Sequence, residues 1–295
     1  MALLCRARVP GVPDPIDHLD AEAAGRWRNF VAGEARTPDA RCSLVFEEEG
    51  RIVAWARMDR ITAGWYALVD LSLCGPPELL GPPALAALAR AFADTRLEAA
   101  SWARHSEPWL HELLLAPTPE GRFELYVEKL YVRRSLEGFV SPYADPFALV
   151  SLVDAGEEAF VDVLAQAMSG SLARDLHPDR PREEFHEMRA MEADTHEPER
   201  WSIALLDGEP AGVILANRFP FDDEATFTFL GLCPAFRGRG LGAVLHARGL
   251  EVLREMGARR YLCSTDLRNT AMLRTYARHG CQPFDVRRQY LWVPR

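Results

Sequence analysis

Short stretches of alternating hydrophobic and polar residues along this chain predict β-strands, and longer stretches with helical spacing separate them. Two strand pairs share one turn, an acidic residue followed by glycine. They are Ser43–Glu48 with Arg51–Arg57, and Trp201–Leu206 with Glu209–Ala216. An acidic residue and glycine between alternating strands is typical of a tight β-hairpin. Strands interspersed with helical segments predict a protein of the α/β class.

The second hairpin belongs to a longer repeat. After each hairpin the same elements follow in the same order, at a nearly constant separation. The corresponding pairs are Trp65–Leu73 with Ala225–Leu232, Ala84–Asp94 with Leu241–Arg254, and Phe123–Val132 with Arg288–Val293. A connector rich in glycine, serine and proline lies between the copies. The pattern predicts a diverged duplication, with domains at residues 1–140 and 147–295.

A glycine-rich segment, Arg237–Gly242, lies between the apolar stretch Phe227–Leu232 and a helical stretch that begins at Leu241. Glycine lets the backbone approach a ligand closely and adopt positive φ. The first turn of a helix offers N–H groups and partial positive charge, so this turn suits a phosphate. A Walker loop would need Lys-Ser/Thr where Ala243 and Val244 follow. The spacing also differs from a dinucleotide fingerprint, which leaves an ordinary glycine-rich turn as the alternative.

A second motif follows downstream. Asn269 is a good helix N-cap, and Gly280 is a good residue to end that helix. Asn269 and Tyr276 share one helix face. Together, Arg-x-x-Gly-x-Gly and this Asn-to-Tyr-x-x-x-Gly helix resemble the GNAT superfamily of N-acyltransferases, over about half of the chain. Cys281 departs from the family pattern, which usually has an aromatic residue there.

The resemblance implies two tandem domains, each with a mixed, mostly antiparallel sheet flanked by helices. It also implies acetyl-CoA or another acyl-CoA as co-substrate, and no metal. Backbone amides of the glycine segment would hold the pyrophosphate, the end of the preceding strand would contact the pantetheine arm and the thioester carbonyl, and Asn269 would hydrogen-bond the pantetheine. The implied acyl-CoA contacts are Leu232, Cys233, Arg237, Gly238, Arg239, Gly240, Leu241, Gly242 and Asn269.

The resemblance also implies catalytic residues. Tyr276 is the candidate general acid for the leaving thiolate, and its alternative role is to fill the core. Many family members carry a glutamate before the loop, but Thr226 stands at the aligned position. Glu224 is therefore the first candidate for the general base, then Asp266, with His177 a third.

The first copy lacks these features. Its counterpart of the glycine segment, Cys74–Pro83, contains four prolines, which remove four N–H donors. We therefore expect this copy to be degenerate. It would act as a scaffold, as a wall of the substrate cleft, or in place of a second subunit, so the chain would be a monomer with an internal pseudo-dimer or a homodimer.

Composition narrows the function further. The net charge is −9, which disfavours nucleic acid and anionic membranes as partners. No apolar stretch has the length of a membrane span, and the six cysteines and eight histidines show no disulfide or metal-site spacing. These features predict a cytoplasmic protein.

The sequence therefore predicts a transfer of an acyl group, most simply acetyl, from acyl-CoA to a primary amine by direct attack in a ternary complex. The acceptor is expected to be a small molecule or a peptide. A non-catalytic acyl-CoA sensor is the alternative, kept open by Thr226. A structural protein with two inactive sites is a third, which the intact glycine segment disfavours.

Overall fold

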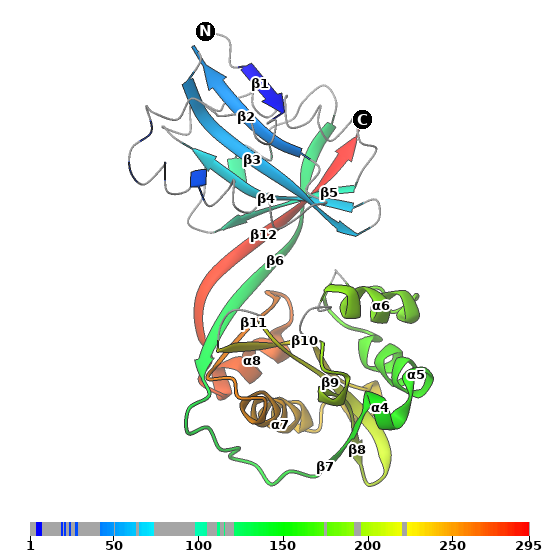
Figure 1. Cartoon of the computed structure of the whole chain (residues 1–295). Coiled ribbons are helices and arrows are strands. Elements are labelled where there is room, and N and C mark those ends of the chain that lie inside the picture. Colours follow the sequence, from blue (N-terminus) through cyan, green and yellow to red (C-terminus); the bar gives the residue numbers. More distant parts are fainter. Residues whose placement is uncertain are drawn as a thin grey trace. The chain divides into compact units, whose positions relative to one another are not determined.

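The computed structural model describes residues 4–7, 19, 21, 24, 27–28, 42–49, 51–62, 65–73, 98–104, 111–112, 115, 121–173, 176–191, 196–219 and 223–294. The chain divides into two compact units (Figure 1). Unit 1 comprises Met1–Glu128 with Arg287–Arg295, and unit 2 comprises Lys129–Val286.

Unit 1 contains a mixed sheet. Its strands are β1 (Leu4–Ala7), β2 (Cys42–Glu48), β3 (Arg51–Thr62), β4 (Trp65–Leu73), β5 (Glu98–Arg104) and the end of β12 (Gln282–Pro294). They pair in that order, and every described pairing is antiparallel except the parallel pair β4–β5. The predicted hairpin is confirmed as β2–β3, and Glu49 in its turn has a positive φ of 52°.

Unit 2 contains a second mixed sheet. Its strands are β6 (Gly121–Ser135, from Lys129 onward), β7 (Phe147–Ser151), β8 (Trp201–Leu206), β9 (Glu209–Arg218), β10 (Glu224–Leu232) and β11 (Arg260–Asp266). The strand order is β7-β8-β9-β10-β11-β6, in which the β10–β11 pair is parallel and the other neighbours are antiparallel. The β8–β9 hairpin turns through Asp207 and Gly208, both with positive φ, as the acidic-glycine pattern predicted.

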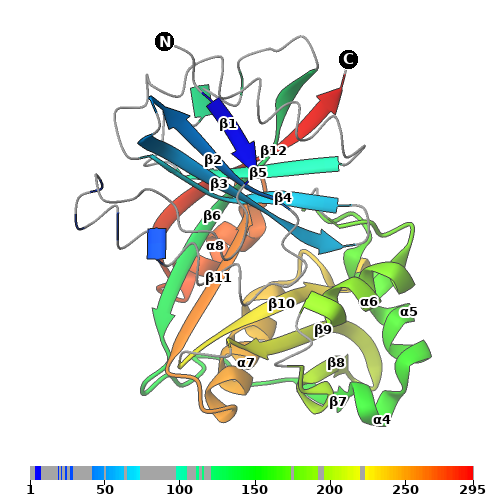
Figure 2. The ribbon, with the colours of Figure 1, turned by 45° about the horizontal axis from the view of Figure 1, so that its top comes forward.

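Helices cover both faces of the unit 2 sheet (Figures 1 and 2). They are α4 (Leu152–Ala155), α5 (Glu157–Met168), α6 (Pro181–Met191), α7 (Leu241–Glu255) and α8 (Thr270–Arg278). Strand β9 shows the two faces by its alternation. Ile214 and Ala216 join the core under α7 and α8, whereas Val213 and Leu215 join the core under α5 and α6.

The two units have the same order of strand pairings across the sheet. Three antiparallel pairings come first, then one parallel pairing, then one more antiparallel pairing. Their last strands are exchanged. Strand β6 follows the strands of unit 1 in the sequence, yet its residues Lys129–Ser135 pair with β11 of unit 2. The strand at the corresponding position in unit 1, beside β5, is β12, the last strand in the sequence.

The predicted domain bounds, 1–140 and 147–295, refer to the order of the copies along the sequence and stay a prediction. The compact units differ from them because of the strand exchange. The loop Cys74–Pro83 and the helix Ala84–Asp94, both predicted for the first copy, lie outside the described residues.

Candidate active site

The unit 2 sheet opens between its two parallel strands. Described pairing between β10 and β11 is limited to Glu224 with Arg260 and Ala225 with Tyr261. Beyond these residues the strands part, as Figure 2 shows. An irregularity between Phe227 and Phe229 shifts the register of β10 against β9 at the start of the opening. Backbone groups that a neighbouring strand would otherwise use therefore face the gap.

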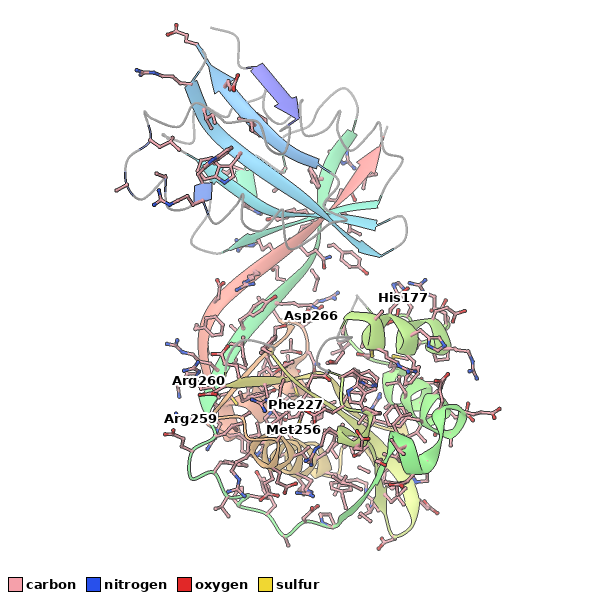
Figure 3. The ribbon with its side chains drawn as sticks, in the orientation of Figure 1. His177, Phe227, Met256, Arg259, Arg260 and Asp266 are labelled. Atoms are coloured by element: carbon pink, nitrogen blue, oxygen red, sulfur yellow. The ribbon has the colours of Figure 1, made fainter. Side chains whose placement is uncertain are left out.

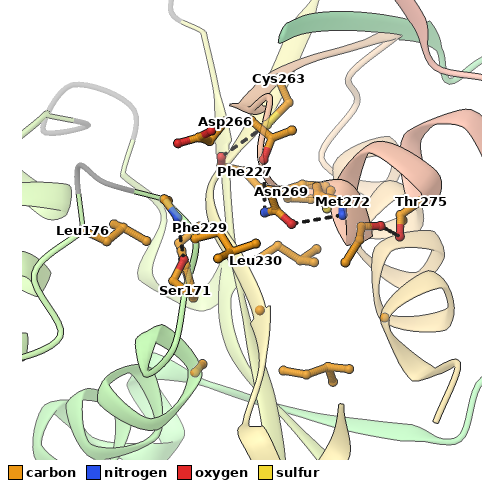
Figure 4. A pocket seen from close by; sticks show the side chains of 18 of the residues that line it. Ser171, Leu176, Phe227, Phe229, Leu230, Cys263, Asp266, Asn269, Met272 and Thr275 are labelled. Carbon is orange, nitrogen blue, oxygen red and sulfur yellow. Dashed lines mark hydrogen bonds between the residues drawn. The ribbon is translucent and has the colours of Figure 1, made fainter. Parts of the chain in front are cut away.

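A cavity of about 370 Å³ occupies this opening. Its walls come from the parted strands, from α8, and from the segment after α5, and all of these belong to unit 2. Figure 4 shows Ser171 and Leu176 on one side of β10, and Asn269, Met272 and Thr275 on the other. A cavity between separated strands is the shape that an extended ligand needs.

The last residues of β10 direct their backbone groups in alternation. The Cys233 N–H donates to the Ala211 carbonyl on β9 at 2.8 Å, and the Cys233 carbonyl accepts from the Phe236 N–H at 3.0 Å. Since antiparallel pairing alternates along a strand, the N–H groups of Leu230 and Leu232 face away from β9, into the opening. Leu232 thus remains a predicted ligand contact, whereas the Cys233 N–H and C=O already have partners within the protein.

The glycine segment ends at the first turn of α7. Gly238 and Gly240 have φ of +75° and +79°, and Gly240 is the N-cap of α7 without a capping side chain. A Cβ at either glycine would meet no atom within 4 Å, so the backbone conformation rather than space requires glycine. Gly242 lines the cavity. The helix N-terminus therefore adjoins the opening, as anion binding requires.

The two arginines of the segment have different surroundings. The Arg237 guanidinium donates to the carbonyls of Leu232 at 2.9 Å, Ser169 at 2.7 Å and Ala167 at 2.8 Å. It therefore links the glycine segment to the end of α5 and to the cavity wall that follows. The exposed Arg239 guanidinium lies 5.7 Å from the centre of the Phe236 ring. Of the two predicted sources of positive charge, Arg239 makes fewer contacts within the protein.

Helix α8 brings Asn269 and Tyr276 to one cavity wall. Asn269 Oδ1 accepts from the Met272 N–H at 3.2 Å, and its Nδ2 donates to Thr265 Oγ1 at 3.2 Å, so Asn269 is the N-cap. The Tyr276 ring is buried, and its hydroxyl donates to the Ser264 carbonyl at 3.2 Å. Burial raises the pKa of Tyr276 well above its usual value. Tyr276 is thus a core residue that also lines the cavity.

The candidate bases differ in position. Glu224 accepts from Arg260 Nε at 2.9 Å where β10 and β11 are still paired, and it is not among the described lining residues. Asp266 is buried in the lining and accepts from the Arg268 backbone N–H at 2.8 Å and from its guanidinium at 2.6 Å. His177 lies outside the described lining (Figure 3). The assignment of the base stays a prediction.

Sequence reasoning missed Lys129 as a lining residue. Lys129 is the only lysine of the chain, a fact consistent with codon usage alone, and it falls within the predicted first domain. The exchange of β6 carries it into unit 2, opposite Asp266 of β11. The only sequence feature that could have singled out Lys129 is that the chain has no other lysine.

The sequence patterns also did not predict a buried pair of histidines. The Nδ1 atoms of His246 and His279 lie 2.7 Å apart, with the rings stacked, and His246 Nε2 lies 3.3 Å from the Tyr261 hydroxyl. Burial lowers the pKa of His246 well below its usual value and that of His279 to about 4. Both rings are therefore neutral near pH 7, and they join α7 to the end of α8.

Comparisons with known proteins agree with this geometry. Residues 165–281 match the model of the acetyltransferase (GNAT) family. These residues, which include the opened strands and the glycine segment, form a domain of that family. No curated protein matches the chain.

Solved structures extend the likeness in fold over the whole chain. A GCN5-related N-acetyltransferase from Sphaerobacter thermophilus is 16% identical, with a TM-score of 0.66 over 99% of this chain and 96% of its own. A tandem GNAT protein from the clavulanic acid biosynthesis pathway is 15% identical, with a TM-score of 0.59 over 99% and 98% of the two chains. The predicted fold, a mixed and mostly antiparallel sheet of the tandem GNAT type, is thus confirmed.

Among the residues that the structure describes, no helix is long and apolar enough to cross a membrane. The same residues contain no group of three or more potential metal ligands.

Proposed function

We propose that the chain transfers an acyl group, most simply acetyl, from acyl-CoA to a primary amine of a small molecule or peptide. The observation that carries the proposal is the opening between β10 and β11, which leads to the N-terminus of α7 at Gly240. The opening offers strand amides to a pantetheine arm, and the glycine segment offers helix amides to a pyrophosphate. The unit 1 copy is taken as degenerate, so one acyl-CoA binds per chain.

The chemistry needs little covalent assistance. The amine nitrogen attacks the thioester carbonyl, a C–N bond forms and the C–S bond breaks. The amine loses a proton, and the thiolate gains one. Holding both reactants in register supplies much of the acceleration. The N–H groups of Leu230 and Leu232 would polarise the carbonyl. Tyr276, whose high pKa keeps its proton at neutral pH, would protonate the thiolate.

A sensor that binds acyl-CoA without turnover is the second candidate. The observation that favours the sensor is that neither candidate carboxylate is placed as an available general base. Glu224 lies at the closed end of the strands, and the Asp266 oxygens already accept hydrogen bonds from Arg268. Under the enzyme proposal, a water chain to Asp266 would remove the amine proton, or the amine would arrive neutral.

Calorimetry and a turnover assay separate the two candidates. Titration with CoA should give one site per chain. Incubation with acetyl-CoA and a panel of primary amines should then release CoA only when an acceptor is present. Binding without release over the whole panel would favour the sensor. An absence of CoA binding would contradict both candidates, and two equivalent sites would contradict the degenerate first copy.

A further inference from the structure

We propose that Lys129 binds an anionic group of the acceptor, so that the acceptor is an amine that also carries a carboxylate or a phosphate. This inference rests on the proposed function and adds the substrate class. It starts from the composition of the chain. Lysine and arginine together number 34, and Lys129 is the only lysine among them. Every other Lys/Arg position holds arginine, and the single lysine lines the cavity together with Arg237.

The fold places Lys129 in the cavity lining on β6, apart from the glycine segment. It lies on β6 directly opposite Asp266, the last residue of β11, and both line the cavity. The segment after α5, with Ser171 and Leu176, lines the same cavity. Gly242, the last residue of the glycine segment, lines the cavity at the N-terminus of α7, where the pyrophosphate would lie. Lys129 comes from a different strand, β6, which β11 separates from β10.

Like Lys129, the other ionic side chains of the described lining interact within the protein. Arg237 donates to three backbone carbonyls, and Asp266 is paired with Arg268. A lysine ammonium carries three donors, so a contact within the protein still leaves donors for a ligand. A compact ammonium on a flexible stem also needs less room than a planar guanidinium. This difference matters in a cavity of about 370 Å³ that must also hold the thioester end of acyl-CoA.

The overall charge makes a local cation useful. The chain has a net charge of −9, so its mean field repels anions. The ammonium of a lysine that lines the cavity would add positive charge at short range, where it would act on the bound acceptor. Lys129 would thus orient the acceptor by its anionic group and leave the amine directed at the thioester.

Matched acceptor pairs test the inference. Each pair consists of an amine with its acidic group and the same amine without that charge, such as an amino acid and its amide, or phosphoethanolamine and ethanolamine. With acetyl-CoA, the wild-type protein should favour the acidic member of at least one pair by about 10-fold or more in kcat/KM, the value of one hydrogen bond to a charged group. Lys129→Met should bring that ratio to about one through KM, with CoA affinity retained. Lys129→Arg should keep part of the preference.

Arg133→Met is the control, because it removes a cation from the same strand at a position outside the described lining. Its acid-to-neutral ratio should equal that of the wild type. Equal ratios in the wild type and Lys129→Met, or no preference in the wild type, would overturn the inference while the proposed function stands. A gain of one acetyl group on Lys129, detected by mass spectrometry, would overturn it in favour of self-acylation.

The inference stays testable without turnover. If no amine is acetylated, the proposed function fails, and the thermal shift caused by each acceptor in the presence of CoA becomes the measurement. Stabilisation by acidic members only, lost in Lys129→Met, would support an anion site in a sensor. No shift with any acidic member would overturn the inference as well.

Discussion

The two ends of strand β10 differ although they belong to one strand. At its start β10 pairs with β11, and Glu224 forms an ion pair with Arg260 across the two strands. At its end the strands have parted, the Leu230 and Leu232 amides face a cavity, and α7 and α8 cover the opening. A bound ligand needs free backbone N–H and C=O groups and a cavity, and pairing between β10 and β11 would occupy both. The open end therefore carries the candidate site, and the closed end holds the sheet together.

The largest expected effect concerns the glycine segment at the open end. Gly240→Val should weaken CoA binding on the order of 1000-fold, because it distorts the positive φ of the α7 N-cap. This corresponds to the loss of two charge-assisted hydrogen bonds of about 2 kcal/mol each. The control is Gly208→Val in the β8–β9 turn, where φ is also positive. It should lower stability similarly but keep CoA affinity in calorimetry. If Gly240→Val binds CoA as tightly as Gly208→Val does, CoA must bind elsewhere.

Acid should affect the helices that cover the open end. His246 and His279 join α7 to the end of α8, and the pKa of each is lower in the folded protein than its usual value near 6.5. The unfolded chain therefore binds their protons first, so the stabilisation is full above about pH 6.5 and is lost as the pH falls toward 4. His279 alone should account for about 3 kcal/mol of this loss.

Denaturant melts between pH 4 and 7 measure this loss. His279→Gln removes one titrating ring, so its stability should fall less steeply over the same range than that of the wild type. Nearby Arg134 and Arg278 disfavour protonation of His279 and remain in both proteins. Identical slopes for the two proteins would show that the histidine pair does not control acid stability.

Tyr276 tests whether the open end performs chemistry. Tyr276→Phe should lower the rate of CoA release at saturating acetyl-CoA by about 100-fold, with CoA affinity changed only a few-fold. The buried ring stays, and the lost hydrogen bond to the Ser264 carbonyl should cost about 1 kcal/mol of stability. The measurements are single-turnover rates with an acceptor and a melting curve. A lower melting temperature with an unchanged rate would leave Tyr276 as a core residue only.

Much of this architecture could be predicted from local patterns. The Asp207-Gly208 turn, the glycine segment and the Asn269 cap each depend on a few adjacent residues, and the structure forms all three. Alternation also predicted the strands of both hairpins. These features were accessible because turn geometry, positive φ and helix capping are set by neighbouring residues.

Long-range arrangement was not predictable in the same way. The periodicity of β6 shows that it is a strand but not which sheet receives it, so Lys129 was missed. Strand alternation also placed Glu224 on the face of Thr226, but it could not show that β10 and β11 are still paired there. Two of the three carbonyl partners of Arg237 lie far away in sequence, at Ala167 and Ser169.

Asn269 combines a structural role with a predicted ligand contact at the open end. Asn269→Ala should cost about 1 kcal/mol through loss of the α8 N-cap, and it should weaken CoA binding by roughly the value of one hydrogen bond, up to about 10-fold. Asn269→Ser restores the cap but not the amide. If Asn269 contacts the pantetheine, the serine variant should recover stability without recovering affinity. Recovery of both would mean that Asn269 acts only as a cap.

The smallest effect should come from the closed end. Glu224→Gln removes a partly exposed ion pair with Arg260, which is worth about 0–1 kcal/mol. If the division of β10 into a closed and an open end is correct, the rate of CoA release should change less than about two-fold, and its pH profile should keep its shape. Asp266→Asn is the comparison, because Asp266 lines the cavity. A large rate loss in Glu224→Gln, with the acidic limb of the pH profile removed, would make Glu224 the base and would require the acceptor to reach the paired end of the strands.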